Sequence, residues 1–166
     1  MRIRSVIVAA VFIGAAQASP ALAQPQSATA TMTVSVSTSA KLTISSSTLT
    51  FADANPDLVP QIAPAQGALS ITAKARATDN AQVVLTVQAD DDLRSGLQVI
   101  PASAITWTAS GTGFASGTLS KTAPVTLGQW TGSGSRTGSQ TLAFRNLWTY
   151  ATGTYTCVLL YTLSGP

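Results

Sequence analysis

The fold class is decided by the stretch Gly-Thr-Tyr-Thr-Cys-Val-Leu-Leu-Tyr-Thr-Leu at residues 153–163. From position 155 onward, every second residue is Tyr, Cys, Leu, Tyr or Leu. Successive side chains of an extended strand point to opposite faces, so these five side chains share one face. This period of two predicts a β-strand that packs one face against a core.

The same period continues through most of the preceding chain, and no helical pattern competes with it. It predicts further strands near residues 31–37, 42–44, 49–51, 69–76, 83–89, 105–107, 125–127 and 142–144. Turn-forming residues interrupt the alternation at residues 79–80, 95–96, 111–113 and 152–153. Such a pattern is typical of an all-β protein with an antiparallel sandwich or barrel. The count of about 8 to 10 strands suffices for a two-sheet β-sandwich.

One irregular segment, residues 52–66, separates these strands and carries Pro56, Pro60 and Pro64. Proline lacks the backbone N–H that a central strand donates, so we interpret the segment as a surface crossover between sheets. The composition does not break elsewhere. We therefore predict one domain over residues 30–166.

The N-terminus has the layout of a secretory signal peptide. Arg2 and Arg4 precede an uncharged apolar run, and Ala21-Leu22-Ala23 fits the small-residue cleavage pattern. The run is about twelve residues long, too short for a membrane-spanning helix; an N-terminal membrane anchor is the alternative. We expect a signal peptide over residues 1–23 and a flexible N-terminus over residues 24–29. The protein should be exported to the periplasm, the cell surface or the medium, without a transmembrane helix.

The composition excludes much catalytic chemistry. The chain has no His and no Glu, which rules out a Ser-His-Asp triad and His-ligated zinc. Asp pairs or a Ser with a Lys stay conceivable, but no spacing singles any of them out. We expect no catalytic residue and no cofactor, and a hydrolase that uses Asp carboxylates is the weakest hypothesis.

Only 9% of the residues are charged, against roughly 25% in an average domain. Ser and Thr, 43 in number, solvate the outer faces of the strands instead. Edge strands thereby lose the charged residues that normally prevent edge-to-edge pairing. We therefore expect the partners to be other protein subunits, or further copies of the chain, bound by strand pairing.

The charge distribution argues against a nucleic-acid partner. Beyond residue 23, seven Lys and Arg stand against six Asp. Nucleic-acid-binding proteins cluster their basic residues. Here these residues are spread along the sequence, as Lys41, Lys74, Arg76, Arg94, Lys121, Arg136 and Arg145.

Cys157 is the one cysteine, so no intramolecular disulfide can form. It is either a thiol that crosslinks subunits or a small buried apolar residue. Its place on the apolar face of residues 155–163 favours the buried residue.

Three consecutive carboxylates follow the predicted strand at residues 83–89 and are the candidate metal ligands. They are Asp90, Asp91 and Asp92. Calcium binds such oxygen ligands. A solvated turn and an ion pair with Arg94 are the alternative interpretations.

Residues 132–138, Gly-Ser-Gly-Ser-Arg-Thr-Gly, miss the spacing of both a dinucleotide-binding loop and a P-loop. We interpret them as a flexible hairpin tip from which Arg136 contacts a ligand.

Aromatic side chains are the other candidates for ligand binding. Trp107 shares a face with Ile105 and is predicted to lie in the core. Trp130 lies on the opposite face from Val125 and Leu127, so we expect its ring to be exposed.

Trp148 and Tyr150 continue the face of Leu142 and Phe144, and either cap the core or join Trp130. Exposed Trp and Tyr rings stack on sugars. The predicted ligand-binding residues are Trp130, Trp148, Tyr150 and Arg136, with a glycan as the ligand.

Two elements carry a family resemblance. Gly153-Thr154-Tyr155 opens the long terminal strand, and Leu49-Thr50-Phe51 precedes an Asp- and Pro-containing stretch. Both resemble elements of the spore-coat-U-like and pilin-type secreted bacterial modules. Those families often carry paired cysteines near the first strands, which this chain lacks. The resemblance implies an exported, immunoglobulin-like subunit of a pilus, coat or surface layer, with no catalytic residues.

Residues 29–37 alternate just behind the expected cleavage site. They form either the first strand of their own sandwich or a strand that completes a neighbour's sheet. Since the chain already supplies about 8 to 10 strands, we expect the former. Our hypothesis is an exported, non-enzymatic β-sandwich with a structural, adhesive or pilus- or coat-assembly role. A carbohydrate-binding module is the alternative.

Overall fold

The structure is a computed structural model that describes residues 28–165. The predicted signal peptide lies outside the described residues. The chain divides into two units, Met1–Ser35 and Val36–Pro166. In the first unit, residues 28–35 form neither helix nor strand. The strands described below belong to the second unit.

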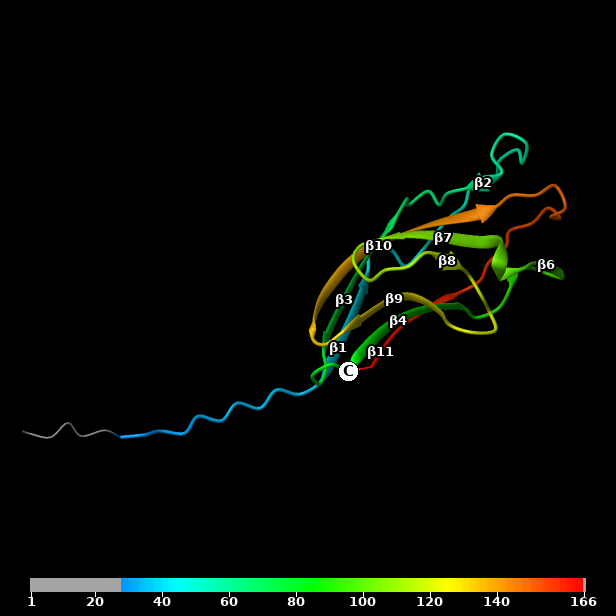
Figure 1. Ribbon diagram of the computed structural model, residues 1–166. Helices are drawn as coiled ribbons and strands as arrows, with labels where there is room; N and C mark the ends of the chain where they lie inside the picture. The colour runs from blue at the N-terminus through cyan, green and yellow to red at the C-terminus, as the bar shows by residue number, and fades with distance from the viewer. Residues whose placement is uncertain (1–27, 166) are drawn as a thin grey trace, which may run out of the picture. The chain divides into compact units, whose positions relative to one another are not determined.

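Two antiparallel sheets face each other as the layers of a β-sandwich (Figure 1), which confirms the predicted all-β sandwich. The first sheet has the order β1-β3-β10-β7-β8, with β2 also paired to β10. Its strands are β1 (Ser39–Ile44), β2 (Gln61–Ile62), β3 (Leu69–Arg76), β7 (Ile105–Ser110), β8 (Gly117–Thr118) and β10 (Gly134–Arg145). The second sheet has the order β11-β4-β9, with strands β4 (Gln82–Ala89), β9 (Val125–Thr131) and β11 (Leu159–Ser164).

A small hairpin and one short helix complete the described elements. The hairpin pairs β5 (Leu93–Ser95) with β6 (Gln98–Ile100), and the 3-10 helix η1 (Ala102–Ala104) leads into β7. Gly96 has a φ of 57° at the tip of this hairpin, a left-handed conformation that favours glycine. No helix among residues 28–165 is long and apolar enough to cross a membrane.

The core lies between the sheets and follows the predicted alternation. In β3 the buried residues are Leu69, Ile71, Ala73 and Ala75, and in β4 they are Val83, Leu85, Val87 and Ala89. The intervening side chains point outward and are mostly polar. The period of two therefore predicted both central strands and the faces that they bury.

Two predicted strands do not form. Residues 31–37 pair with no other strand of the described chain, and β1 begins only at Ser39. Residues 49–51 pack on the core without joining a sheet, because Thr50 bonds to a loop instead. The Thr50 N–H donates to Gln66 Oε1 at 2.9 Å, and the Thr50 carbonyl accepts from the Ala65 N–H at 2.8 Å.

The last strand, β11, is shorter than the strand predicted over residues 155–163. Its regular part begins at Leu159, whereas the pattern placed the start near Tyr155. Thr156 instead exchanges two backbone hydrogen bonds of 3.0 Å with Arg94 of β5. Residues 155–158 thus run beside the hairpin of β5 and β6, and the chain pairs with β4 only from Leu159 onward.

Replacing Leu85 by Ala should destabilise the domain strongly, because this residue of the central strand β4 is fully buried. Truncating a buried Leu typically lowers the free energy of unfolding by about 2–5 kcal/mol. The neighbouring Thr86→Ala, on the outward face, should cost less than about 1 kcal/mol. Urea unfolding followed by tryptophan fluorescence measures both. Equal losses would contradict the assignment of faces in β4.

Candidate functional site

The two sheets are joined along one side of the sandwich. There β8 pairs with β7 of the first sheet, and the residues just before β8 bond to β9 of the second. The Ala115 N–H donates to the Leu127 carbonyl at 2.8 Å, and the Gln129 N–H donates to the Gly113 carbonyl at 2.8 Å. Backbone hydrogen bonds therefore close this side.

The opposite side is open. Here β1 ends the first sheet and β11 ends the second, and within the described chain each pairs along one edge only. Between them lies a cleft of about 660 Å³, which we call the edge groove. Its lining is mainly apolar, and includes Leu42, Ile44, Leu49, Phe51, Leu69, Ile105, Leu142, Tyr155, Cys157, Leu159 and Tyr161.

The inward side chains of the two edge strands are only half-buried. Leu42 and Ile44 of β1 keep this intermediate exposure, as do Leu159, Tyr161 and Leu163 of β11. The inward residues of β3 and β4 are almost entirely buried by comparison. The alternation on β1 and β11 thus presents an apolar face that the described domain does not cover.

Polar groups make up a minority of the groove lining. The Tyr161 hydroxyl donates to Gln140 Oε1 at 2.7 Å, which links the second sheet to the first. Burial raises the pKa of Tyr161 to about 12, so this phenol stays neutral and remains a donor. Cys157 is half-buried in the groove wall, and burial raises the pKa of its thiol. It faces the groove among apolar neighbours.

An apolar segment without a strand partner precedes β1. The exposed fractions of Met32, Val34 and Val36 are 88%, 73% and 69%. Between them stand Thr33 and Ser35, so the segment keeps the alternation of a strand with one apolar face. Residues 29–37 form no strand, so our expectation that they are the first strand of the chain's own sandwich is wrong.

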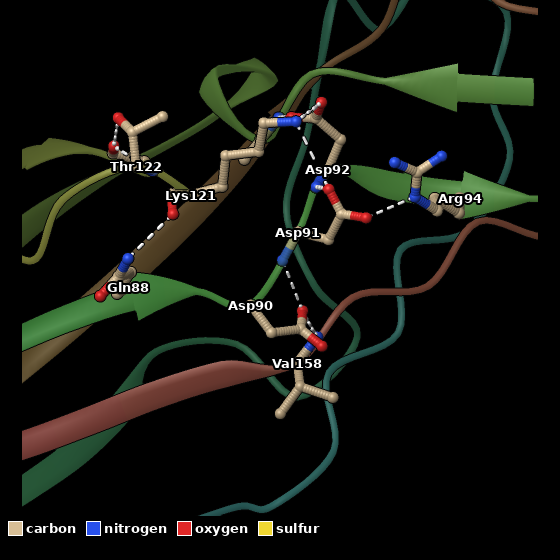
Figure 2. A network of polar contacts seen from close by, with 10 residues as sticks. Gln88, Asp90, Asp91, Asp92, Arg94, Lys121, Thr122 and Val158 are labelled. Atoms are coloured by element: carbon tan, nitrogen blue, oxygen red, sulfur yellow. Dashed lines mark hydrogen bonds and ion pairs between the residues drawn. The ribbon is translucent and has the colours of Figure 1, made fainter.

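The acidic turn after β4 is a network of polar contacts (Figure 2). Asp90 Oδ1 accepts the Val158 N–H at 2.8 Å, while the Asp90 N–H donates to the Val158 carbonyl at 3.0 Å. Asp92 Oδ1 accepts the Ala102 N–H at 2.9 Å. These bonds connect the end of β4 to the residues before β11 and to η1.

Two of the carboxylates also form ion pairs. Asp91 pairs with Arg94, and Lys121 lies 2.6 Å from Asp92 Oδ2 and 3.4 Å from Asp91 Oδ1. The hydrogen bond from Arg94 is the main cause that holds the pKa of Asp91 well below its usual range. The bond from Lys121 lowers the pKa of Asp92 in the same way. The structure therefore shows the ion pair with Arg94 that the sequence offered as an alternative interpretation, and its partner is Asp91.

The candidate metal ligands Asp90, Asp91 and Asp92 each accept hydrogen bonds from backbone or side-chain donors. Asp91 and Asp92 share one of these donors, the Lys121 ammonium. Among residues 28–165, no three His, Cys, Asp or Glu side chains come together as metal ligands. In this structure the three carboxylates act as acceptors that fix neighbouring loops.

The prediction that Trp130 is exposed is wrong. Its exposed fraction is 8%, and its ring packs 5.8 Å from that of Phe114. A β-bulge between β4 and β9 is the cause, because the register skips Leu127 and turns both Leu127 and Trp130 inward. Gly128 makes room for the ring, since a Cβ there would lie 2.6 Å from Trp130.

The other predicted aromatic residues separate into core and surface. Trp107 is buried, as predicted, and its Nε1 donates to the Ala115 carbonyl at 2.9 Å. Tyr150 is half-buried and packs 5.8 Å from Phe144, so it caps the core. Trp148 is 68% exposed and its Nε1 donates to Asp57 Oδ1 at 3.0 Å. Because β10 ends at Arg145, Trp148 does not continue its inward face.

Arg136 does not lie at a hairpin tip. The strand β10 already begins at Gly134, and Arg136 pairs with Ala73 of β3 on the inward face of the sheet. Its side chain is half-buried, and its Nε makes no hydrogen bond among the described residues. Trp130, Tyr150 and Arg136 thus point into the sandwich, and only Trp148 of the four predicted ligand-binding residues is exposed.

One cluster of basic residues was not predicted from the sequence. Lys41 of β1 stands directly opposite Lys74 of β3, and Arg76 follows two residues later on the same outward face. The alternation alone places Lys74 and Arg76 together. Lys41 joins them only through the pairing register of strands that are distant in the sequence.

The sequence matches no protein-family model and no curated protein.

The ion pairs of the acidic turn should make stability fall at low pH. The folded-state pKa values of Asp91 and Asp92 lie below the usual 3.8, so the stabilisation is complete above that value. It is lost as the pH falls from about 4 toward the lower folded-state values. In Asp91→Asn/Asp92→Asn, the free energy of unfolding should decline less steeply between about pH 5 and about pH 2 than in the wild type.

Urea unfolding at constant ionic strength measures these slopes. Asp79→Asn is the matched control, because Asp79 lies in the β3–β4 turn and forms no ion pair within the described chain. Identical slopes for the double variant and the wild type would contradict a stabilising role for the network.

Proposed function

We propose that the protein is an exported structural subunit that assembles with further copies of itself by strand donation. In this assembly, residues 30–38 of one copy occupy the edge groove of another and pair with β1, β11 or both. The observation that carries the proposal is the half-buried apolar face of β1 and β11 beside two unpaired strand edges. An added strand supplies backbone partners for an edge and side chains for the cleft.

The donor segment fits the groove in length and pattern. Seven extended residues, 31–37, span roughly 23 Å, and the six residues of β1 span roughly 20 Å. In an extended conformation, Met32, Val34 and Val36 enter the groove while Thr31, Thr33 and Ser35 face water. Each apolar side chain moved from water into the groove contributes roughly 1.5–3 kcal/mol.

Insertion into the same copy is disfavoured by the local sequence. The segment continues directly into β1 through Val36-Ser37-Thr38-Ser39. A tight hairpin reversal beside β1 needs residues with positive φ, for which Gly, Asn or Asp is preferred. None of these residues is present at this junction. A strand that runs on in line with β1 reaches a second copy instead.

Composition and the predicted leader support the same role. A surface rich in Ser and Thr leaves the two edge strands with a single charged side chain, Lys41 of β1, so few charges oppose strand addition. The predicted signal peptide supports export. The resemblance to spore-coat-U-like and pilin-type modules supports an immunoglobulin-like subunit of a pilus, coat or surface layer.

Val34→Asp should abolish assembly, because it places a charge on the apolar face of the donor segment. Ser35→Asp is the matched control, since it adds the same charge to the outward face of the same segment. Light scattering and negative-stain microscopy of the protein without its predicted leader should show polymers for the wild type and Ser35→Asp, and monomers for Val34→Asp. At a protein concentration too low for assembly, all three should unfold at the same urea concentration. A wild type that stays strictly monomeric at high concentration would overturn the proposal.

The single native cysteine permits a direct test of the contact. Cys157 lines the groove, so a second cysteine at position 32, 34 or 36 should form an intermolecular disulfide with it under mild oxidation. Cysteines at positions 33 and 35 are the controls and should react at least tenfold more slowly. Equal crosslinking at inward and outward positions would show that the segment does not bind with its apolar face in the groove.

A second candidate function is glycan binding, which the exposure of Trp148 favours. The ring is held by its bond to Asp57, beside a shallow cleft lined by Leu58 and Leu147. Trp148→Ala should reduce binding on a glycan array by at least about fivefold, because a lost aromatic contact of about 1 kcal/mol corresponds to that factor. Asp57→Asn keeps the ring exposed and serves as the control. Absence of any glycan binding by the wild type would eliminate this function.

A further inference from the structure

Three basic side chains gather on the outward face of the first sheet. Lys41 and Lys74 are direct cross-strand partners in the β1–β3 pairing, and Arg76 lies two residues beyond Lys74. All three are exposed. We call Lys41, Lys74 and Arg76 the basic patch. Cross-strand neighbours and next-but-one residues are roughly 5 to 7 Å apart, so the three charges lie close together.

No acidic side chain of the described residues forms an ion pair with the basic patch. The ion pairs of residues 28–165 are made by Arg94 and Lys121 only. Ser39 stands opposite Arg76, and Ser135 stands on the other side of Lys74. Like charges directly opposite each other destabilise a sheet. A bound anion would relieve this repulsion.

Rows of Thr and Ser side chains, which are direct partners across neighbouring strands, lie beside the basic patch. Thr43, Thr72 and Thr137 form one row across β1, β3 and β10. Ser70, Ser139 and Ser110 form another across β3, β10 and β7. None of the outward positions of β1 and β3 carries an aromatic or large aliphatic side chain.

We propose that the basic patch and the adjoining hydroxyl rows bind an anionic polysaccharide. The carboxylate or sulfate groups of the polymer lie between Lys41, Lys74 and Arg76, and its sugar hydroxyls bond to the rows of Thr and Ser. A lipid surface fits less well, because this face has no apolar side chain to enter a membrane. Duplex nucleic acid also fits less well, because its high charge density, one phosphate per about 1.7 Å of helix, favours faces with many more than three cations.

The test uses the full protein without its predicted leader and three polymers of similar size: polygalacturonate, dextran sulfate and neutral dextran. Binding to the two anionic polymers, measured by biolayer interferometry, should weaken as the salt concentration rises. Lys41→Gln/Lys74→Gln should lower the affinity at least tenfold. Arg145→Gln, at the far end of β10, removes an exposed positive charge away from the patch and should change the affinity less than twofold.

A stability readout separates lost binding from lost folding. The double variant should unfold at the same or a higher urea concentration than the wild type, because it removes two opposed like charges. The oligomeric state of each sample is measured in parallel, since several linked copies raise the apparent affinity.

Three results would overturn the proposal. The first is unchanged binding by Lys41→Gln/Lys74→Gln, and the second is equal binding to neutral dextran. The third is tighter binding to phosphatidylglycerol vesicles or duplex DNA than to either anionic polysaccharide.

Discussion

The backbone groups along the outer edges of β1 and β11 have no strand partner within the described chain, and this constraint shapes the open side of the sandwich. Backbone N–H and C=O groups need partners, which at an open edge are water or another strand. At the joined side, residues 113–115 supply such partners to β9. Nothing comparable spans β1 and β11, so their inward side chains stay half-buried and a groove remains.

The acidic turn positions one wall of that groove. Asp90 bonds to both backbone groups of Val158, and Arg94 exchanges backbone bonds with Thr156. These contacts direct residues 155–158 toward the β5 hairpin, which leaves Tyr155 and Cys157 in the groove wall. The carboxylates of this turn thus serve as structural acceptors. Because Asp90 directly follows β4 and bonds to Val158, it holds the end of β4 beside the start of β11.

The sequence predicted the parts of the fold that depend on alternation alone. The sandwich and the buried faces of β3 and β4 follow from apolar residues at every second position, because a strand side chain has only two directions. Trp107 was placed correctly for the same reason. The inward face of residues 155–163 was also correct, although its burial is incomplete.

The errors arise where pairing, not periodicity, decides the outcome. A single bulge at Leu127 reverses the face of Trp130, and nothing in the local pattern marks that residue as the extra one. Residues 31–37 have the pattern of a strand, but the junction with β1 lacks the Gly, Asn or Asp of a tight turn that would fold them back onto an open edge. The basic patch likewise depends on the register that sets Lys41 against Lys74. Each of these features is set by residues far apart in the chain.

The two proposed binding surfaces are compatible because they use opposite faces of the same strand, β1. In β1, Leu42 and Ile44 face the groove, whereas Lys41 and Thr43 face outward. A donated strand beside β1 would fill the groove with Met32, Val34 and Val36, and would turn Thr31, Thr33 and Ser35 to the outer face. Assembly would then extend the hydroxyl surface beside the basic patch without covering it. Each added copy would bring another patch, so a weak contact with a polymeric anion would become stronger through effective concentration.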